Sequence, residues 1–263
     1  MMDEIQTYLE EDGLLHCAVC KEPVEAFYPK GSFLEMRKHH RQCACERQAY
    51  AEEVKYYKEK EHQEWVVRNK KICFEEKEME DFIFQNVDRD SGAIRIAKEY
   101  VANWQKMKQN HMGYLFWGPV GTGKSYLAAC IANALLEQEV TVKMTNFNTI
   151  LNDLFAAEDK TGYIRALNRY ELLIIDDLGV ERSSEYALEN IFSVIDWRYR
   201  SGKPLIITTN IPLVQLKQET KIDKKRIYDR ILERCIPVKI DGVSRREAMA
   251  NDNMQIMKNI LKI

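Results

Sequence analysis

Residues 118–125 read GPVGTGKS, which is a complete G-x-x-x-x-G-K-[ST] phosphate-binding pattern. The apolar run 113–117 before it has the composition of a strand, and residues 125–136 after it have the composition of a helix. In this setting the glycines let the backbone wrap a phosphate closely, and the amides at the helix start point toward the anion. The stretch therefore predicts a nucleotide-binding loop between a strand and a helix; the alternative is a glycine-rich turn that binds nothing.

The side chains of this loop suggest how it would hold ATP. The Lys124 ammonium can reach the β- and γ-phosphates, and the Ser125 hydroxyl is an expected Mg²⁺ ligand. The other residues expected to contact the nucleotide are Gly118, Pro119, Val120, Gly121, Thr122, Gly123 and Tyr126.

Composition limits the class of protein. The chain has 263 residues, of which 45% are hydrophobic, and a formal net charge of −2. These values suit one medium domain with its own core plus a smaller appendage. No apolar run approaches the roughly 20 residues of a membrane-spanning helix, and the acidic residues 1–5 lack the apolar region of a signal peptide. We therefore expect a cytoplasmic protein with no membrane partner.

The pattern along the chain predicts three segments. Residues 1–45 are expected to form a small module that begins with a short exposed helix over 1–12. Residues 46–79 are expected to form a linker helix with a thin apolar stripe, for which a solvated spacer is the alternative. From 80 to 263, strand-like runs alternate with helix-like stretches, which predicts an α/β domain with a five-stranded parallel sheet. The strand-like runs are 114–117, 140–145, 172–176, 204–209 and 236–240.

Two carboxylates follow the most apolar of these runs. Residues 172–175 are Leu-Leu-Ile-Ile, and Asp176 and Asp177 come directly after them. Ligands of open parallel sheets bind at the carboxyl ends of the strands. We expect Asp176 to hold Mg²⁺, directly or through a water, and Asp177 to polarise the water that attacks the γ-phosphate. A strand that simply ends in a polar turn is the alternative.

Asn210 follows the next strand-like run, 204–209. Its amide can hydrogen-bond the attacking water or the γ-phosphate and so respond to whether the phosphate is present. Asn210 is also a plausible N-cap for a helix that begins near Pro212. The two roles are compatible.

Arginines recur every fourth residue over 226–234, which places them on one side of a helix. An arginine supplied by a neighbouring subunit can stabilise charge on a transferring phosphoryl group. The alternative is a solvated helix face in which Arg226 pairs with Asp229 and Arg230 pairs with Glu233.

Four cysteines cluster near the N-terminus. Cys17 and Cys20 form a C-x2-C pair, Cys43 and Cys45 form a C-x-C pair, and the stretch around them is poor in apolar residues. A module without a core needs a staple, and four thiolates around a tetrahedral Zn²⁺ supply one. Four free thiols are the alternative. Nearby histidines could also replace one cysteine: His16, His39 and His40.

The combination of motifs resembles the AAA+ ATPases of the DnaC/DnaI helicase-loader and IstB transposition-helper family. The likeness covers roughly residues 80–246 and is specific because several motifs occur in order. The motifs are GPVGTGKSYLAACIANALL at 118–136, LLIIDDLGVE at 172–181, PLIITTN at 204–210 and RIYDRILERCIPVKIDGVSRR at 226–246.

The resemblance implies roles for individual residues. Asn210 would be the sensor-1 residue, Arg230 the arginine finger that acts on a neighbour, and Arg245 or Arg246 the sensor-2 residue that contacts the nucleotide. Two features depart from the family pattern. Asp177 stands where AAA+ proteins usually have glutamate, so the carboxylate is on a shorter side chain. About 20 residues follow the last strand-like run, which are too few for a full helical lid.

The leading functional hypothesis is a helicase loader. ATP-bound subunits would assemble side by side around single-stranded DNA, the zinc module would hold a hexameric replicative helicase, and hydrolysis would release it. One alternative is an IstB-like transposition helper that acts on duplex DNA, but the cysteine cluster favours the loader. Another is a nucleotide-gated adaptor that barely hydrolyses ATP, which the short Asp177 side chain keeps open.

Overall fold

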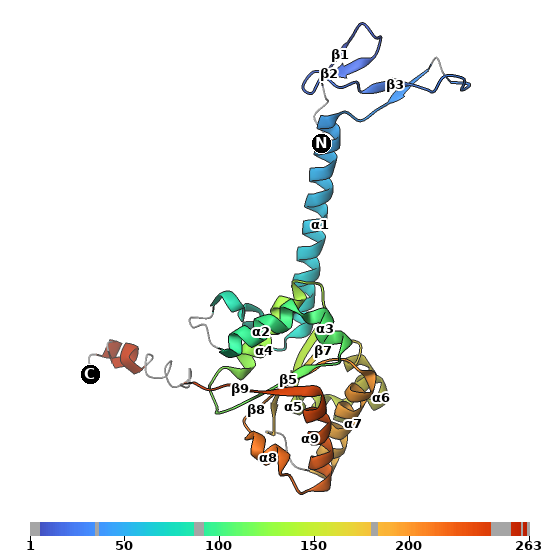
Figure 1. Ribbon diagram of the computed structural model, residues 1–263. Helices are drawn as coiled ribbons and strands as arrows, with labels where there is room; N and C mark the ends of the chain where they lie inside the picture. Colours follow the sequence, from blue (N-terminus) through green and yellow to red (C-terminus); the bar gives the residue numbers. More distant parts are fainter. Residues whose placement is uncertain are drawn as a thin grey trace. The chain divides into compact units, whose positions relative to one another are not determined.

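The computed structural model describes residues 6–34, 37–86, 92–179, 184–242, 254–258 and 260–261. The chain divides into two compact units, Met1–Glu64 and Trp65–Ile263, and each is described by itself (Figure 1). Helix α1, Ala44–Cys73, crosses the boundary between them. Within the described residues, no helix combines the length and the apolar character that a bilayer crossing requires.

The first unit contains two short antiparallel hairpins. Strand β1 (Thr7–Leu9) pairs with β2 (Leu15–Cys17), and β3 (Glu25–Phe27) pairs with β4 (Lys38–His40). The prediction of a short helix over 1–12 is therefore wrong for residues 6–12, the part of that segment that the structure describes. Gly13 adopts a left-handed φ of 76° in the loop, and this turn brings β1 and β2 together. Backbone pairing with a neighbouring strand overrides the local helical spacing.

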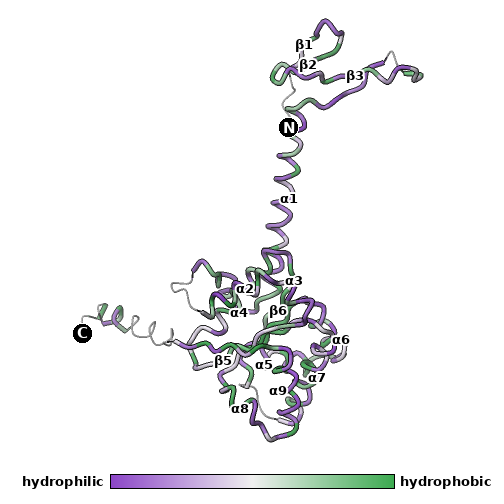
Figure 2. Tube along the Cα trace, viewed as in Figure 1, coloured by the Kyte–Doolittle hydropathy of each residue, from purple (hydrophilic) through white to green (hydrophobic). Residues whose placement is uncertain are grey.

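Helix α1 occupies the segment expected to form a linker helix. At its start, Glu46 accepts a hydrogen bond of 2.9 Å from the backbone N–H of Cys43, which closes the first turn. The expected apolar stripe of this helix includes two tyrosines, Tyr50 and Tyr57, whose side chains are 55% and 54% exposed. Figure 2 shows that most of the α1 tube is hydrophilic. The segment is thus both helical and largely solvated.

The second unit is built on a five-stranded parallel sheet with the order β6-β7-β8-β5-β9. This confirms the predicted fold class. The strands are β5 (Gly113–Trp117), β6 (Val142–Asn146), β7 (Leu172–Leu178), β8 (Leu205–Thr209) and β9 (Cys235–Lys239). They match the five predicted runs closely, and the central strands β5, β7 and β8 are apolar on both faces, as a covered parallel sheet requires.

Alternate residues of each strand face opposite sides of the sheet. In β7, Leu172 and Ile174 belong to one buried cluster, and Leu173 and Ile175 belong to the other. The first face is covered by α2 (Gly92–Ala102), α3 (Trp104–Gln109) and α4 (Lys124–Leu136). The second is covered by α5 (Phe147–Ala156), α6 (Lys160–Leu167), α7 (Glu185–Ser201), α8 (Leu213–Lys217) and α9 (Ile222–Arg234).

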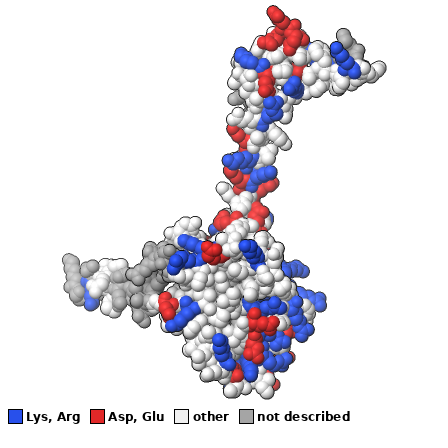
Figure 3. All heavy atoms as spheres, viewed as in Figure 1, with Lys and Arg blue, Asp and Glu red and all other residues white. Residues whose placement is uncertain are grey.

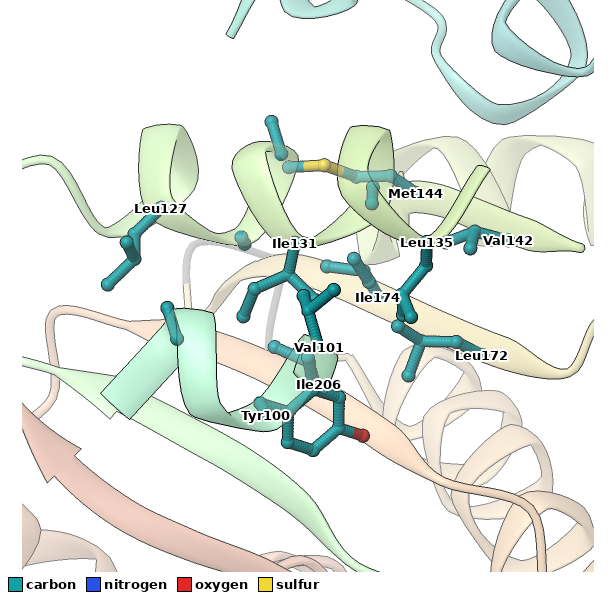
Figure 4. Close-up of a cluster of buried hydrophobic side chains, with 14 of the residues drawn as sticks. Tyr100, Val101, Leu127, Ile131, Leu135, Val142, Met144, Leu172, Ile174 and Ile206 are labelled. Atoms are coloured by element: carbon teal, nitrogen blue, oxygen red, sulfur yellow. The ribbon is translucent and has the colours of Figure 1, made fainter. Parts of the chain in front are cut away.

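Helix α4 is anchored by its apolar side chains. Leu127, Ile131 and Leu135 point from the same side of α4, and Leu135 lies beside the sheet residues Leu172 and Ile174 (Figure 4). Ile131 and Leu135 are fully buried, and burial of such a side chain stabilises the fold by about 1.5–3 kcal/mol. The packing fixes the axis of α4, and therefore the direction in which its first turn points.

A short segment before α2 crosses α4. It contains the 3₁₀ helices η1 (Lys77–Asp81) and η2 (Phe84–Asn86). The Asn133 amide of α4 donates hydrogen bonds to the carbonyl oxygens of Met79 and Phe82, at 2.8 Å and 3.0 Å. These bonds fix the segment against the helix that carries the end of the phosphate-binding pattern.

Candidate functional site

The predicted phosphate loop lies between β5 and α4. Gly121 and Gly123 have φ values of 80° and 93°, so the loop uses the left-handed backbone region that favours glycine. At Gly118, an added Cβ would lie 2.2 Å from the carbonyl oxygen of Ile240, so no other residue fits there. Gly123 is the N-cap of α4, and the first-turn amides of that helix face the loop. The geometry is that of an anion-binding helix start.

Lys124 lies inside this loop. Its ammonium donates hydrogen bonds to the carbonyl oxygens of Pro119 (2.7 Å) and Gly118 (3.1 Å), and the residue is only 5% exposed. The Thr122 hydroxyl also donates to the Pro119 oxygen, at 2.9 Å. The charged group is thus held where phosphate oxygens of a bound nucleotide would replace carbonyl oxygens as its partners.

Asp176, near the carboxyl end of β7, lies beside the phosphate loop. Its carboxylate accepts hydrogen bonds from the hydroxyls of Thr208 and Ser125. The two expected Mg²⁺ ligands, Ser125 and Asp176, are therefore in contact. Burial raises the pKa of Asp176, the largest cause of its shift.

Asp177 has an unusual backbone. Its φ is 54°, in the left-handed region, and the pairing of β7 with β8 shifts register between Ile175 and Leu178. The shift turns the Asp177 carboxylate toward Asn210, whose side-chain nitrogen lies 3.5 Å from Asp177 Oδ1. A left-handed non-glycine residue costs about 1–2 kcal/mol, and such strain concentrates at functional sites.

Asn210, at the carboxyl end of β8, lies next to the Asp177 carboxylate. Its Oδ1 atom is buried and has no hydrogen-bond partner within the described part of the chain. The structure rejects the expected N-cap role, because α8 begins at Leu213 and its N-cap is Pro212. The amide is thus available for a ligand at the carboxyl end of β8.

The sequence analysis missed Thr208. This fully buried residue donates to Asp176 through its hydroxyl and accepts, at 2.9 Å, the hydrogen bond of the Asp177 backbone N–H. One hydroxyl therefore holds both the Asp176 carboxylate and the Asp177 backbone. A hydroxyl within an otherwise apolar buried strand was the available signal, because buried polar groups need partners.

A pocket opens beside the two aspartates, and the sequence analysis missed its other walls as well. Glu76 contributes from the segment after α1, and the remaining lining comes from the end of β6 and the start of α5. The neighbouring Glu75 accepts hydrogen bonds from Thr145 (2.7 Å) and Thr149 (2.9 Å), which tie that segment to β6 and α5. The sequence shows no motif that would predict this connection.

Tyr126, expected to contact the nucleotide, lies in the first turn of α4. Its hydroxyl donates to the carbonyl oxygen of Ile83 at 3.2 Å, and its ring lies 4.7 Å from that of Phe82. It thus joins the phosphate loop to the segment that contains η1 and η2.

The arginines of α9 lie apart from the phosphate loop. Arg230 and Arg234 line a pocket with Leu205, the first residue of β8, whereas the loop follows the carboxyl end of β5. Arg230 forms an ion pair of 2.8 Å with Asp196 of α7. The alternative pairing of Arg230 with Glu233 is therefore wrong, because helix packing places a better partner across the α7–α9 contact.

Arg234, unlike Arg230, forms no ion pair with a residue that the structure describes. Its guanidinium stacks on the ring of Tyr199, with 4.6 Å between the guanidinium carbon and the ring centroid. Its buried Nε, like that of Arg230, has no hydrogen-bond partner among the residues that the structure describes. Arg245 and Arg246, the expected sensor-2 candidates, lie outside the described residues.

The four cysteines of the first unit come together. Their sulfur atoms all lie within 4.8 Å of one another; Cys17 ends β2, and Cys43 and Cys45 lie at the start of α1. Zn–S bonds of about 2.3 Å place the sulfurs of a tetrahedral site somewhat under 4 Å apart, so the cluster fits zinc. Backbone amides of Cys45 and Glu22 lower the pKa of Cys20 to about 6, whereas the contact with Cys20 raises the pKa of Cys45, so without a metal the thiols share their protons unequally.

The histidines have other partners than this cluster. His39 Nδ1 lies 2.9 Å from the carbonyl oxygen of His40, and His40 lies 3.4 Å from Glu46. His16 contacts the carbonyl oxygen of Lys21 and the side chain of Asp12. The structure thus groups four sulfurs without a histidine.

Comparison with known proteins agrees with this geometry. The family described as IstB-like ATP binding protein matches residues 47–252, so the chain belongs to that family. The replicative helicase loader DnaC of Escherichia coli (strain K12) is 28% identical over 144 residues, which are 53% of this chain and 56% of DnaC. The phage-like element PBSX protein XkdC of Bacillus subtilis (strain 168) is 26% identical over 160 residues, 56% of this chain and 58% of XkdC.

Solved structures give the same result. The crystal structure of DnaI superposes with a TM-score of 0.57 and 26% identity, and the match covers 68% of this chain and 99% of that one. The resemblance to the DnaC/IstB-like AAA+ proteins is confirmed. The chain spans little more than half the length of the curated relatives that it matches.

Replacing Thr208 by valine should test its part in the site. The side chain keeps its volume, but the Asp177 N–H and the Asp176 carboxylate each lose a hydrogen-bond partner. We expect a stability loss of about 1–3 kcal/mol and ATP turnover that falls about 10- to 100-fold. Thr209→Val is the matched control, because the Thr209 hydroxyl bonds only to backbone groups. Equal turnover of the two variants, measured per folded molecule, would contradict this role.

Removal of zinc should unfold the cysteine cluster. The described apolar core of this module is small, with Val24 as its one buried residue that is not a cysteine. Its folding free energy would therefore come from the metal. We expect Cys17→Ser to lose its zinc and to show the circular dichroism of an unfolded first module. Cys130→Ser, in α4, should keep both the zinc and the wild-type spectrum. Metal-free protein with an intact first unit would contradict the zinc site.

Proposed function

We propose that this protein is a cytoplasmic AAA+ ATPase that loads a hexameric replicative helicase onto single-stranded DNA. The observation that carries the proposal is the meeting of Ser125, Asp176, Asp177 and Asn210 beside the phosphate loop. Membership of an ATP-binding family that includes DnaC-like relatives supports the rest.

In this proposal each group acts on a different part of ATP. Residues 118–126 bind the phosphates, with Lys124 closest to the β- and γ-phosphates. Ser125 and Asp176 would hold Mg²⁺, which would neutralise phosphate charge. Asp177 orients the attacking water and takes up its proton, and Asn210 hydrogen-bonds the water or the γ-phosphate.

The functional division follows the sequence. We assign residues 1–45 to a zinc module that docks on the helicase, 46–79 to a linker and 80–263 to the ATPase domain. The boundary between the compact units, at Glu64 and Trp65, falls within the linker. ATP-bound copies would assemble around single-stranded DNA, and hydrolysis would release the helicase.

The loading experiment uses forked DNA, the cognate helicase and ATP. The wild-type chain should bind the helicase and start unwinding, whereas Asp177→Asn should bind it and fail to release it, because an amide cannot take up the proton. Asp229→Asn, an exposed aspartate on α9, should behave as wild type. Binding to duplex DNA without helicase association would favour the IstB-like alternative, and normal release by Asp177→Asn would favour the adaptor.

The finger proposed at Arg230 needs a test that separates it from Asp196. If Arg230 acts on a neighbour's ATP, Arg230→Ala should bind ATP, lose about 10³–10⁵ in turnover, and regain activity when mixed with Asp177→Asn. Mixed sites would combine an intact Asp177 with an intact Arg230.

Arg234→Ala is the comparison, because Arg234 forms no ion pair within the described residues. If only the mixture of Arg234→Ala with Asp177→Asn regains activity, then Arg234, and not Arg230, is the arginine finger. If Arg230→Ala only loses stability, to the same extent as Asp196→Ala, then the α7–α9 ion pair is structural and the Arg230 proposal fails.

A further inference from the structure

A second cluster of metal-ligating side chains lies in the first unit, separate from the four cysteines. It consists of His16 on β2 and of Glu10 and Asp12 in the loop between β1 and β2, and its ligand atoms lie within 4.8 Å of one another. His16 Nε2 is 3.0 Å from Asp12 Oδ2 and 3.6 Å from Glu10 Oε2. Figure 3 shows acidic side chains gathered over this loop. His16 itself is only 7% exposed.

The hydrogen bonds of His16 determine which ring nitrogen faces the Asp12 and Glu10 carboxylates and whether it carries a proton. Its Nδ1 lies 3.0 Å from the carbonyl oxygen of Lys21. A carbonyl oxygen only accepts, so Nδ1 carries a proton, and the neutral ring presents the lone pair of Nε2. Carboxylates also only accept. Three acceptors that converge on one point repel one another unless a proton on Nε2 or a metal ion lies between them.

A proton on Nε2 would satisfy only part of this arrangement. It would bond to Asp12 at 3.0 Å, but Glu10 Oε2 at 3.6 Å is beyond hydrogen-bond distance. A metal ion can be shared by all three atoms. The neighbouring ammonium groups are engaged elsewhere: Lys38 bonds to the Gly13 carbonyl and Glu25, and Lys21 lies over the ring of Tyr8.

Each candidate ligand is also held through the atom that would face away from the metal. Asp12 Oδ1 accepts the Leu14 backbone N–H at 2.9 Å, and Glu10 Oε1 accepts the Tyr8 hydroxyl at 3.3 Å. His16 Nδ1 donates to the Lys21 carbonyl. Outer partners of this kind orient metal ligands and are typical of metal sites in proteins.

We propose that His16 Nε2, Asp12 and Glu10 bind a divalent transition-metal ion, with zinc as the ion to test. Imidazole nitrogen and carboxylate oxygen are suitable zinc ligands, and three protein ligands leave a position for water. The ion joins the loop to β2 and, through Lys21, to the turn that follows Cys20. It shares no ligand with the cysteine cluster, so the first unit contains two independent metal sites.

The test is a zinc titration of the full-length chain, purified with its cysteine cluster loaded and dialysed against a weak chelator. Elemental analysis and calorimetry should find two zinc ions per chain at saturation. Asp12→Asn combined with Glu10→Gln should retain one, with the affinity of the second site reduced about tenfold or more. Glu11→Gln changes the exposed acid between the two ligands and should keep two.

Cobalt separates the two sites by spectrum. Co²⁺ added to the zinc-loaded chain should give d–d bands without sulfur charge transfer, because its ligands are nitrogen and oxygen. Saturation of the wild-type chain at one zinc, or a cobalt spectrum with sulfur bands alone, would overturn the proposal and leave a His16 imidazolium paired with Asp12. So would two zinc ions in the double variant. Glu10→Gln alone, at a half-exposed side chain, provides the measurement if the double variant unfolds.

Discussion

The parallel alignment of β5, β7 and β8 is the constraint on which the candidate site depends. Trp117 lies opposite Thr209 across β5 and β8, so the phosphate loop and the end of β8 start from the same edge. The register shift in β7 then lets the Thr208 hydroxyl reach both Asp176 and Asp177. A slip of one residue would turn Thr208 to the opposite face and separate the two carboxylates.

The sequence predicted the fold well because its signals are local. The five strands are apolar runs, and the loop pattern lies between strand and helix where its chemistry requires. The contacts that depend on distant packing were not predictable. Thr208 acquires its partners from a bulge in another strand, and Arg230 pairs with Asp196 because α7 packs on α9. The spacing of apolar residues over 1–12 predicted a helix, but residues 7–9 form a strand because they pair with 15–17. That pairing depends on residues outside the segment, so its own spacing could not predict it.

The two units depend on different sources of stability. The second unit buries two apolar clusters against its sheet, so its fold follows from the hydrophobic effect. The first unit has a small described core around its cysteines, and we propose that a metal bound there supplies its order. Binding of zinc is then coupled to folding of the part that we propose docks on the helicase, and the nucleotide site is independent of it.

The central claim is that the loop 118–125 and the strand carboxylates form an ATP site. Its most direct measurement is Mg²⁺-dependent binding of a fluorescent ATP analogue to the wild-type chain and to Lys124→Ala, with circular dichroism to show that both are folded. Lys106→Ala, at an exposed lysine of α3, is the control for loss of charge. The account predicts that Lys124→Ala alone loses binding, because its ammonium compensates phosphate charge. Unchanged binding by folded Lys124→Ala would contradict it.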